Sequence, residues 1–257
     1  MESLLAIPGA IAIGISLGLL GSGGSILTVP VLVYLVGQDE KVAIAGSLFI
    51  VGSIALAGSL QFLRASLIQW RSVVIFGIPG MLGTYLGAWL ATFVPGITQL
   101  ALFAIVMLIA SWLMLRPLDL EHGNKAARAS WKIAADGLIV GVITGLVGVG
   151  GGFLIVPALV LLGGLGMHQA VATSLVIIAL KSFSGFFKYL DVLEQQSLTL
   201  DWKTLLLVTG LGVAGSFAGS HFAKRLPQQK LKTGFGVFLI AMGVYILARS
   251  APAALGL

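Results

Sequence analysis

Cysteine is absent from the 257-residue sequence, and charged residues are scarce. Without cysteine the chain can form neither disulfides nor thiolate metal sites, and it has no cysteine nucleophile. Asp, Glu, Lys and Arg make up only 9% of the residues, whereas a soluble globular domain carries roughly 25%. So few charges leave too little polar surface to face water on all sides. The composition therefore favours a membrane protein over a soluble domain.

Long apolar runs are abundant in this sequence. The 44 residues between Arg71 and Arg116 contain no charge, and a bilayer-spanning helix needs about 20 apolar residues. The runs are Leu4–Gly37, Val42–Leu63, Ser72–Val94, Ile97–Leu115, Ile133–Gly163, Gln169–Leu190, Trp202–Ala223 and Leu231–Ala248. We therefore expect an all-α integral membrane protein with about 8–10 helical segments.

The net charge of +6 comes from Lys and Arg in short segments between these runs. Basic loops of this kind indicate membrane topology rather than nucleic-acid binding. Three segments are basic: Arg64–Arg71, Arg116–Lys132 and Lys224–Lys232. The N-terminus has no basic start and no cleavage site, so we expect the first run to be retained.

The sequence contains an internal repeat. The segment from Gly18 to Pro30 aligns without a gap with the segment from Gly145 to Pro157, and both carry the pattern G-x-x-G-x-G-G-x-x-x-x-x-P. The agreement continues through Trp70 and Trp202 to the glycines that follow them. We divide the chain into a first repeat (1–116), a linker (117–132) and a second repeat (133–257).

Each repeat opens on a run that is too long for one crossing. Leu4–Gly37 has 34 residues, about 51 Å as a helix, whereas the hydrocarbon core is about 30 Å thick. Glycines interrupt it, so a helical hairpin with shortened arms is favoured. If all basic segments lie on one side, each half crosses an odd number of times. The halves are then inverted, each a hairpin followed by three helices, with both termini outside; a parallel repeat of four spans each is the alternative.

The hairpin tips predict an anion site. Backbone broken inside a bilayer must face protein or a water-filled cavity, and the start of the second arm presents free N–H groups. Ser22 and Ser25 add hydroxyls to the first tip, while Val149 and Gly152 take their places in the second. In the alternative interpretation the glycines serve close packing only.

Lys181 is the sharpest single candidate, because it lies halfway along its apolar run and a lysine at the bilayer centre is costly. Its counterpart in the first half is Ile54. A structural pair or snorkelling are the alternatives to anion binding. The candidate substrate-binding residues are Ser22, Gly23, Gly24, Ser25, Ser47, Gly150, Gly151, Gly152, Thr173, Ser174 and Lys181.

Asp136 is a candidate proton relay, with capping of the adjacent helix as the alternative. No histidine has a partner at ligand spacing, so we expect no metal and no cofactor. Clustered catalytic residues are also lacking, so we expect no enzyme. The stripes Gly83-x-x-x-Gly87 and Gly215-x-x-x-Gly219 are typical of close helix packing.

The doubled glycine motif ending in Pro30 and Pro157, together with the Ala-x-Ala-x-Ser pattern after each copy, resembles the TauE/SafE family of bacterial membrane proteins. The resemblance covers nearly the whole chain. It implies transport of sulfite, sulfonates such as sulfoacetate, or related sulfur-containing anions, by a multi-pass protein of the bacterial inner membrane.

These observations favour a secondary transporter that binds a small sulfur-containing anion near the midplane between the two tips and works by alternating access. A passive anion channel through the same site is the alternative. The expected partners are the anion, the lipid bilayer and a coupling ion, either a proton or sodium. No nucleotide-binding loop is present, so ATP-driven pumping is not expected.

Overall fold

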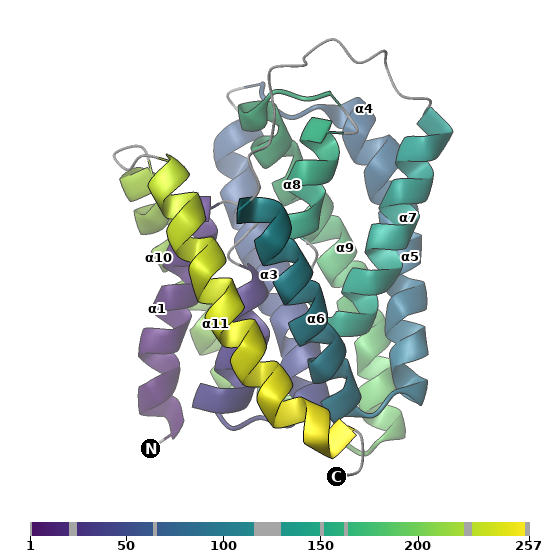
Figure 1. Ribbon diagram of the computed structural model, residues 1–257, viewed down its shortest axis with the longest axis vertical. Helices are drawn as coiled ribbons and strands as arrows, with labels where there is room; N and C mark the ends of the chain where they lie inside the picture. Colours follow the sequence, from purple (N-terminus) through teal and green to yellow (C-terminus); the bar gives the residue numbers. More distant parts are fainter. Residues whose placement is uncertain are drawn as a thin grey trace.

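A computed structural model describes residues 2–20, 25–63, 66–115, 130–149, 152–161, 164–223 and 228–254. Every regular element in these ranges is helical, which confirms the all-α class (Figure 1). In chain order they are α1 (Glu2–Leu20), α2 (Thr28–Pro30), the π-helical η2 (Val31–Leu35), α3 (Glu40–Leu63), α4 (Trp70–Ser72), the π-helical η3 (Val73–Gly77), α5 (Ile78–Leu90), the 3-10 turn η4 (Ala91–Phe93), α6 (Gly96–Leu115), α7 (Ser130–Val147), α8 (Gly152–Leu161), α9 (Met167–Gln195), α10 (Trp202–Ala223) and α11 (Gln228–Ala254).

The apolar runs become helices because lipid cannot satisfy backbone polar groups, which must then bond within the segment. Among the described residues, the stretches long and apolar enough to cross a membrane are Glu40–Leu63, Trp70–Phe93, Ser130–Val147 and His168–Gln195. α9 continues five residues past its predicted end, because a polar turn that carries the ion pair Lys188–Asp191 extends it.

The two predicted hairpins have unequal arms. The first arms are α1, with 19 residues, and α7, with 18. The second arms are short: Thr28–Leu35 in the first half and the 10-residue α8 in the second. The expectation of shortened arms is therefore wrong for α7, which is long enough to cross on its own. The run that opens the second repeat breaks at its predicted glycines, since α7 ends at Val147 and α8 begins at Gly152.

The second hairpin turns where only glycine fits. Gly148 has φ +76°, a conformation that side chains rarely adopt. A Cβ there would also collide with Ile44 of α3. Helix α7 therefore ends against α3 because both the backbone conformation and the packing require a glycine.

The main helix pairs each join one helix from each half. They are α1 with α10, α5 with α7, α6 with α11, and α3 with α9. A Cβ on Gly83 would strike the Leu138 carbonyl of α7, and one on Gly219 would strike the Ile15 carbonyl of α1. The predicted small-residue stripes thus lie at the α5–α7 and α1–α10 interfaces, and the two halves interlock.

The close contacts also give the helix directions. Gly52 lies against Ser182 and Gly58 against Leu175, so α3 and α9 run antiparallel. In α6 and α11, Leu115 faces Gly236 and Leu108 faces Gly243, again antiparallel. An inverted repeat requires matching helices of the two halves to run in opposite directions. The two-fold relation itself stays a prediction, which these directions support.

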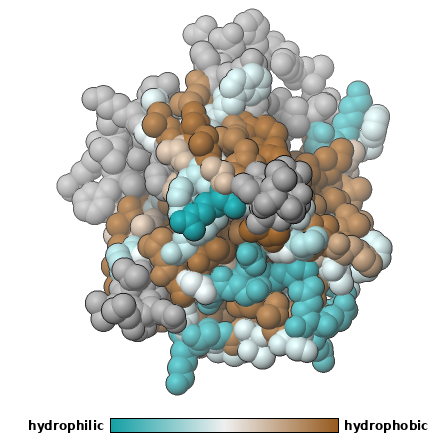
Figure 2. Space-filling view, turned by 60° about the horizontal axis from the view of Figure 1, so that its bottom comes forward, coloured by the Kyte–Doolittle hydropathy of each residue, from teal (hydrophilic) through white to brown (hydrophobic). Residues whose placement is uncertain are grey.

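The two ends of the molecule differ. The N- and C-termini lie at the lower end, while α3, α6 and α10 end, and α4, α7 and α11 begin, toward the upper end (Figure 1). The described parts of the basic segments, with Arg71 and Lys132, are therefore at the upper end. Figure 2 shows hydrophilic residues gathered on the lower end among hydrophobic ones. Asp191, in the last turns of α9, and Asp201, just before α10, lie at this end.

Candidate functional site

Lys181 is the middle residue of the 29-residue helix α9. Its side chain is fully buried, with 0% exposure. The Nζ atom has no hydrogen-bond partner in the part of the chain that the structure describes. Burying an ammonium group without a partner is strongly unfavourable, so this lysine needs an explanation that packing alone does not supply.

The alkyl chain of Lys181 packs against Gly80. A Cβ on Gly80 of α5 would come within 3.0 Å of Lys181 Cδ and 3.4 Å of both Lys181 Cε and the Gly137 carbonyl of α7. Three helices therefore meet at this point, and two of them contribute no side chain to it. The sequence singled out Lys181 but missed Gly80 and Gly137 as its neighbours.

The equivalent point in the other half has the same shape and a different chemistry. Ile54 of α3 faces Gly212 of α10, where a Cβ would lie 2.6 Å from Ile54 Cδ1 and 3.9 Å from the Ala10 carbonyl of α1. Ile54 is 2% exposed and takes the place of Lys181. Among the described residues, α9 therefore carries a buried amine at the point where α3 carries an isoleucine.

Asp136 precedes Gly137 on α7. It is half-buried and already takes part in an interaction of its own. The described residues show no ion pair between Asp136 and Lys181, and Lys181 Nζ has no hydrogen-bond partner among them. Whether Asp136 relays protons stays a prediction.

Ser47 fastens the second hairpin. Its hydroxyl is buried and donates to the Ile44 carbonyl at 2.8 Å and to the carbonyl of Gly148. This is the one predicted site residue for which the structure shows a direct contact with a described tip residue. Helix α3 of the first half thus holds the tip of the second.

Two residues that the sequence did not single out hold the same tip. Gln99 Nε2 donates to the Leu146 carbonyl at 3.2 Å and to Tyr189 Oη at 3.3 Å, and Tyr189 donates to the Leu146 carbonyl at 3.1 Å. Carbonyls at a helix end have no partner within the helix, so these side chains replace it. The signal that could have identified Gln99 is a polar amide near the start of an apolar run.

Thr173 and Ser174 lie on α9, two turns before Lys181, and both are fully buried. Thr173 Oγ1 accepts a hydrogen bond from the Gln69 N–H at 3.0 Å. Ser174 donates to the Val171 carbonyl at 2.8 Å. In this conformation their bonds go to protein backbone.

The structure does not gather the predicted residues at one point. Gly137, beside Lys181, and Gly148 are eleven residues apart on α7, about 16 Å of helix. Ser174 is seven residues from Lys181 on α9, about 10 Å. Ser25 and Gly152 are buried. Ser22, Gly23, Gly24, Gly150 and Gly151 lie outside the described residues.

Two surface cavities in the described part do not touch Lys181. One, of about 530 Å³, lies at the lower end around the α9–α10 connection and includes Trp202. The other, of about 340 Å³, is almost wholly apolar and lies between α1 and η2. No group of three His, Asp or Glu side chains in the described residues could hold a metal ion. With 0% exposure, Lys181 is enclosed in this conformation.

Comparisons with known proteins agree with the membrane fold. Residues 6–246 match the family described as "Sulfite exporter TauE/SafE". A "Probable membrane transporter protein" of Xylella fastidiosa (strain Temecula1) is 33% identical over 246 residues, covering 93% of this chain and 92% of the relative. YunE of Bacillus subtilis (strain 168), with the same description, is 30% identical and covers 95% and 96%.

A third relative, from the archaeon Methanocaldococcus jannaschii, is also described as a probable membrane transporter and is 27% identical, covering 74% of each chain. No solved structure is a significant match. The match spans both halves and the linker between them, in agreement with the resemblance of the doubled glycine motif. The chain therefore belongs to the sulfite exporter TauE/SafE family and is a membrane transporter.

Proposed function

We propose that this protein is a secondary transporter that binds a small sulfur-containing anion, sulfite or an organosulfonate such as sulfoacetate, at Lys181 and carries it by alternating access. One observation carries the proposal: the Nζ atom of Lys181 is buried at the middle of α9 without a partner in the described residues. An ionisable group inside a membrane protein is costly and usually functional. An anion would supply the missing partner.

The surroundings of Lys181 suit an oxyanion. The glycines of α5 and α7 leave backbone rather than side chains beside the lysine. Small residues let another group approach closely, and the lysine acts as a compact point charge with three donors. Sulfite and sulfonate groups each present three oxygens to such a donor. The family description, which names sulfite export, supports the same class of cargo.

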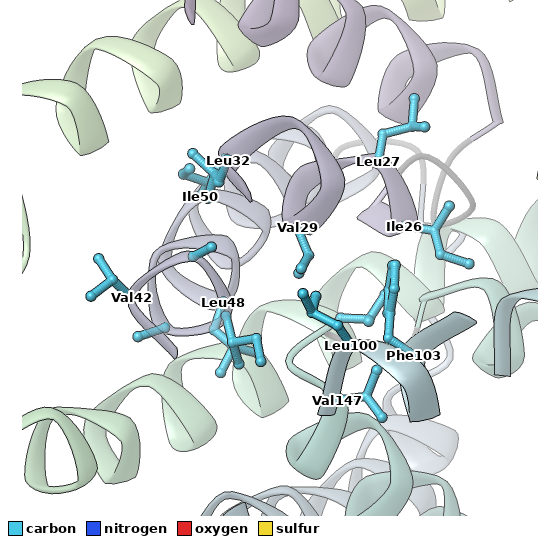
Figure 3. Close-up of a cluster of buried hydrophobic side chains, with 14 of the residues drawn as sticks. Ile26, Leu27, Val29, Leu32, Val42, Leu48, Ile50, Leu100, Phe103 and Val147 are labelled. Carbon is cyan, nitrogen blue, oxygen red and sulfur yellow. The ribbon is translucent and has the colours of Figure 1, made fainter. Parts of the chain in front are cut away.

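Two apolar clusters contain residues of the hairpins. In one, Ile26 and Val29 of the first hairpin pack near Leu100, Phe103 and Val147 (Figure 3). In the other, the buried residues Ile155 and Leu159 of α8 pack with α3, η3 and α9. We infer that each hairpin contributes to one gate, and that opening one gate at a time exposes the lysine to one side of the membrane.

We place the protein in the bacterial inner membrane as a multi-pass protein with its basic, upper end in the cytoplasm. The charges of Arg71 and Lys132 at that end support this orientation. Both termini are then outside. A reporter that is active only in the periplasm is expected to give a signal when it is fused to either terminus. A signal from a cytoplasmic reporter at either end would contradict the orientation.

Uptake by proteoliposomes tests the proposed function. Vesicles containing the purified protein and loaded with unlabelled sulfite are expected to accumulate labelled sulfite by exchange, because alternating access moves bound anions in both directions. Sulfoacetate should compete and sulfate should compete more weakly. Conductance that needs no internal substrate and shows no exchange would instead indicate a passive channel, and no flux of any sulfur anion would contradict the proposal.

A further inference from the structure

The closed structure raises a question of charge balance around Lys181. The described helices packed against α9 are α3, η3, α5, α7 and α8. Neither η3 nor α8 has a titratable residue. On the others, the titratable residues are Glu40 and Lys41 at the start of α3, Tyr85 of α5, and Lys132 and Asp136 of α7.

None of these residues supplies a counter-charge to Lys181. Glu40 and Lys41 are more than ten residues from Gly52, where α3 meets α9, which is at least about 16 Å along the helix. Tyr85 lies under the ammonium of Lys188. Asp136, the nearest in sequence to the Gly137 wall, takes part in another interaction, and no ion pair joins it to Lys181.

When no anion is bound, only the neutral form of a lysine in this position avoids a large free-energy cost. A charged ammonium group without a partner is strongly disfavoured in a low-dielectric interior, and buried lysines neutralise instead. An anion that enters without a proton would meet a neutral amine and gain no ion pair. An anion that enters with a proton forms an ammonium–anion pair of zero net charge.

We propose that Lys181 is the proton-binding site of the transport cycle, so that each monovalent anion crosses together with one proton. This inference rests on the proposed function. The amine takes up a proton as the anion binds, the ion pair crosses with the site closed, and both ions leave on the other side. The amine then returns neutral. The loaded and empty forms carry the same charge, so transport is electroneutral and is driven by a pH gradient rather than by membrane potential.

Arginine at this position separates binding from proton coupling, because its guanidinium stays charged at every accessible pH. Lys181→Arg can still pair with an anion. Its empty form, however, is an unpaired buried cation that cannot return across the closed state. The variant is therefore expected to exchange anion for anion while net uptake falls by roughly one hundredfold or more, since an uncompensated buried charge is strongly unfavourable.

The experiment uses proteoliposomes with a trapped pH dye and methanesulfonate as the transported probe. This anion stays fully ionised, so it carries no proton of its own. Wild type is expected to acidify the lumen by one proton per methanesulfonate taken up, and a potassium diffusion potential set with valinomycin should leave the rate unchanged. The matched control is Lys188→Arg, two helical turns further along α9 and in an ion pair with Asp191, which should behave as wild type.

The outcomes are distinguishable. Methanesulfonate uptake without lumen acidification, or uptake accelerated by the potential, overturns proton coupling and leaves the anion transporter intact. Net proton-coupled uptake by Lys181→Arg also overturns it and assigns the proton to another group. Loss of acidification in Asp136→Asn with Lys181 intact would identify that group as Asp136. If Lys181→Arg does not fold, the wild-type proton count and its response to potential decide the matter. Absence of flux for methanesulfonate, sulfite and sulfoacetate alike would instead overturn the proposed function itself.

Discussion

Lys181 on α9 and Ile54 on α3 occupy matching places in the two halves and differ only in chemistry. Each is buried near the middle of its helix and faces a glycine of a neighbouring helix, Gly80 of α5 for Lys181 and Gly212 of α10 for Ile54. The Ile54 side chain completes an apolar contact. The Lys181 side chain ends in a nitrogen atom, Nζ, with no partner among the described residues.

The repeated scaffold and the proposed binding site depend on different residues. The glycines that allow close packing are present in both halves. The group that can bind an anion, the amine of Lys181, is present in the second half, where the first half has Ile54. A doubled fold can thus supply two gates and a single binding point, which is what one substrate per cycle needs.

Replacing Lys181 is expected to have the largest effect on transport. Lys181→Met makes the two halves chemically alike, and we expect sulfite uptake to fall by roughly one hundredfold or more because the buried amine that pairs with the anion is lost. The protein should stay folded, since a thioether fits an apolar site. The control Ile54→Met should keep transport within about threefold, as a volume-conserving change. Initial uptake rates measure both, and normal uptake by Lys181→Met would contradict the assigned role.

The glycine interfaces test whether the two halves pack equally tightly. A Cβ on Gly145 would strike the Thr84 carbonyl at the α5–α7 interface, and one on Gly219 would strike the Ile15 carbonyl at the α1–α10 interface. Gly145→Ala and Gly219→Ala should each cost about 1–3 kcal/mol, because backbone cannot yield as a side chain does.

Gly210 of α10 is the control for these two variants, because a Cβ there meets nothing within 4 Å. Gly210→Ala should be neutral or stabilise by up to about 1 kcal/mol through helix propensity. Thermal unfolding in detergent compares the three. Equal midpoints for Gly145→Ala and Gly210→Ala would show that α5 and α7 are not in the close contact described.

Tyr189 offers a smaller test, because its counterpart in the first half is Phe62. Tyr189→Phe copies that residue and removes the bonds to the Leu146 carbonyl and Gln99. We expect a loss of about 1 kcal/mol, the usual net value of one hydrogen bond, because Gln99 still bonds the same carbonyl. Faster amide exchange near residues 146–149 would locate the effect at the second tip; unchanged exchange there would count against the fastening role.

The smallest effect concerns the starts of α10 and α4. Asp201 caps α10 by accepting from the Lys203 and Thr204 N–H groups at 3.0 and 3.4 Å, whereas Gln69, before α4, makes no side-chain cap. Asp201→Ala should cost at most about 1 kcal/mol, since the group is exposed.

The pH dependence of that cap has a definite sign. Hydrogen bonding from the Thr204 hydroxyl, and then from the two N–H groups, holds the pKa of Asp201 below its usual value. Its contribution is therefore present above the unfolded carboxyl pKa and is lost as the pH falls through the lower folded pKa. The difference between wild type and Asp201→Ala in thermal unfolding should shrink in acid; a difference that grows would contradict the assignment.

The sequence was sufficient to predict the helices, the glycine breaks and the depth of Lys181, because these depend on local apolar length and on residue type. It missed what depends on distant partners. Gly80 and Gly137 matter to Lys181 only because α5, α7 and α9 meet, and Gln99 and Tyr189 act on a carbonyl 43 or 47 residues away in the chain. The distance between the hairpin tips and Lys181 along the helices likewise depends on the lengths of the hairpin arms. Apolar composition does not determine those lengths.

The most direct test of the account is the position of a bound anion. Crystals of the protein grown with 2-bromoethanesulfonate would locate the ligand by the anomalous signal of bromine. The account predicts a peak beside Lys181 near the Gly80 and Gly137 backbone, with the sulfonate oxygens within hydrogen-bonding distance of Nζ, and no such peak in Lys181→Met. A peak at the second hairpin tip near Ser47 and Gly148, with Lys181 still unpartnered, would contradict it.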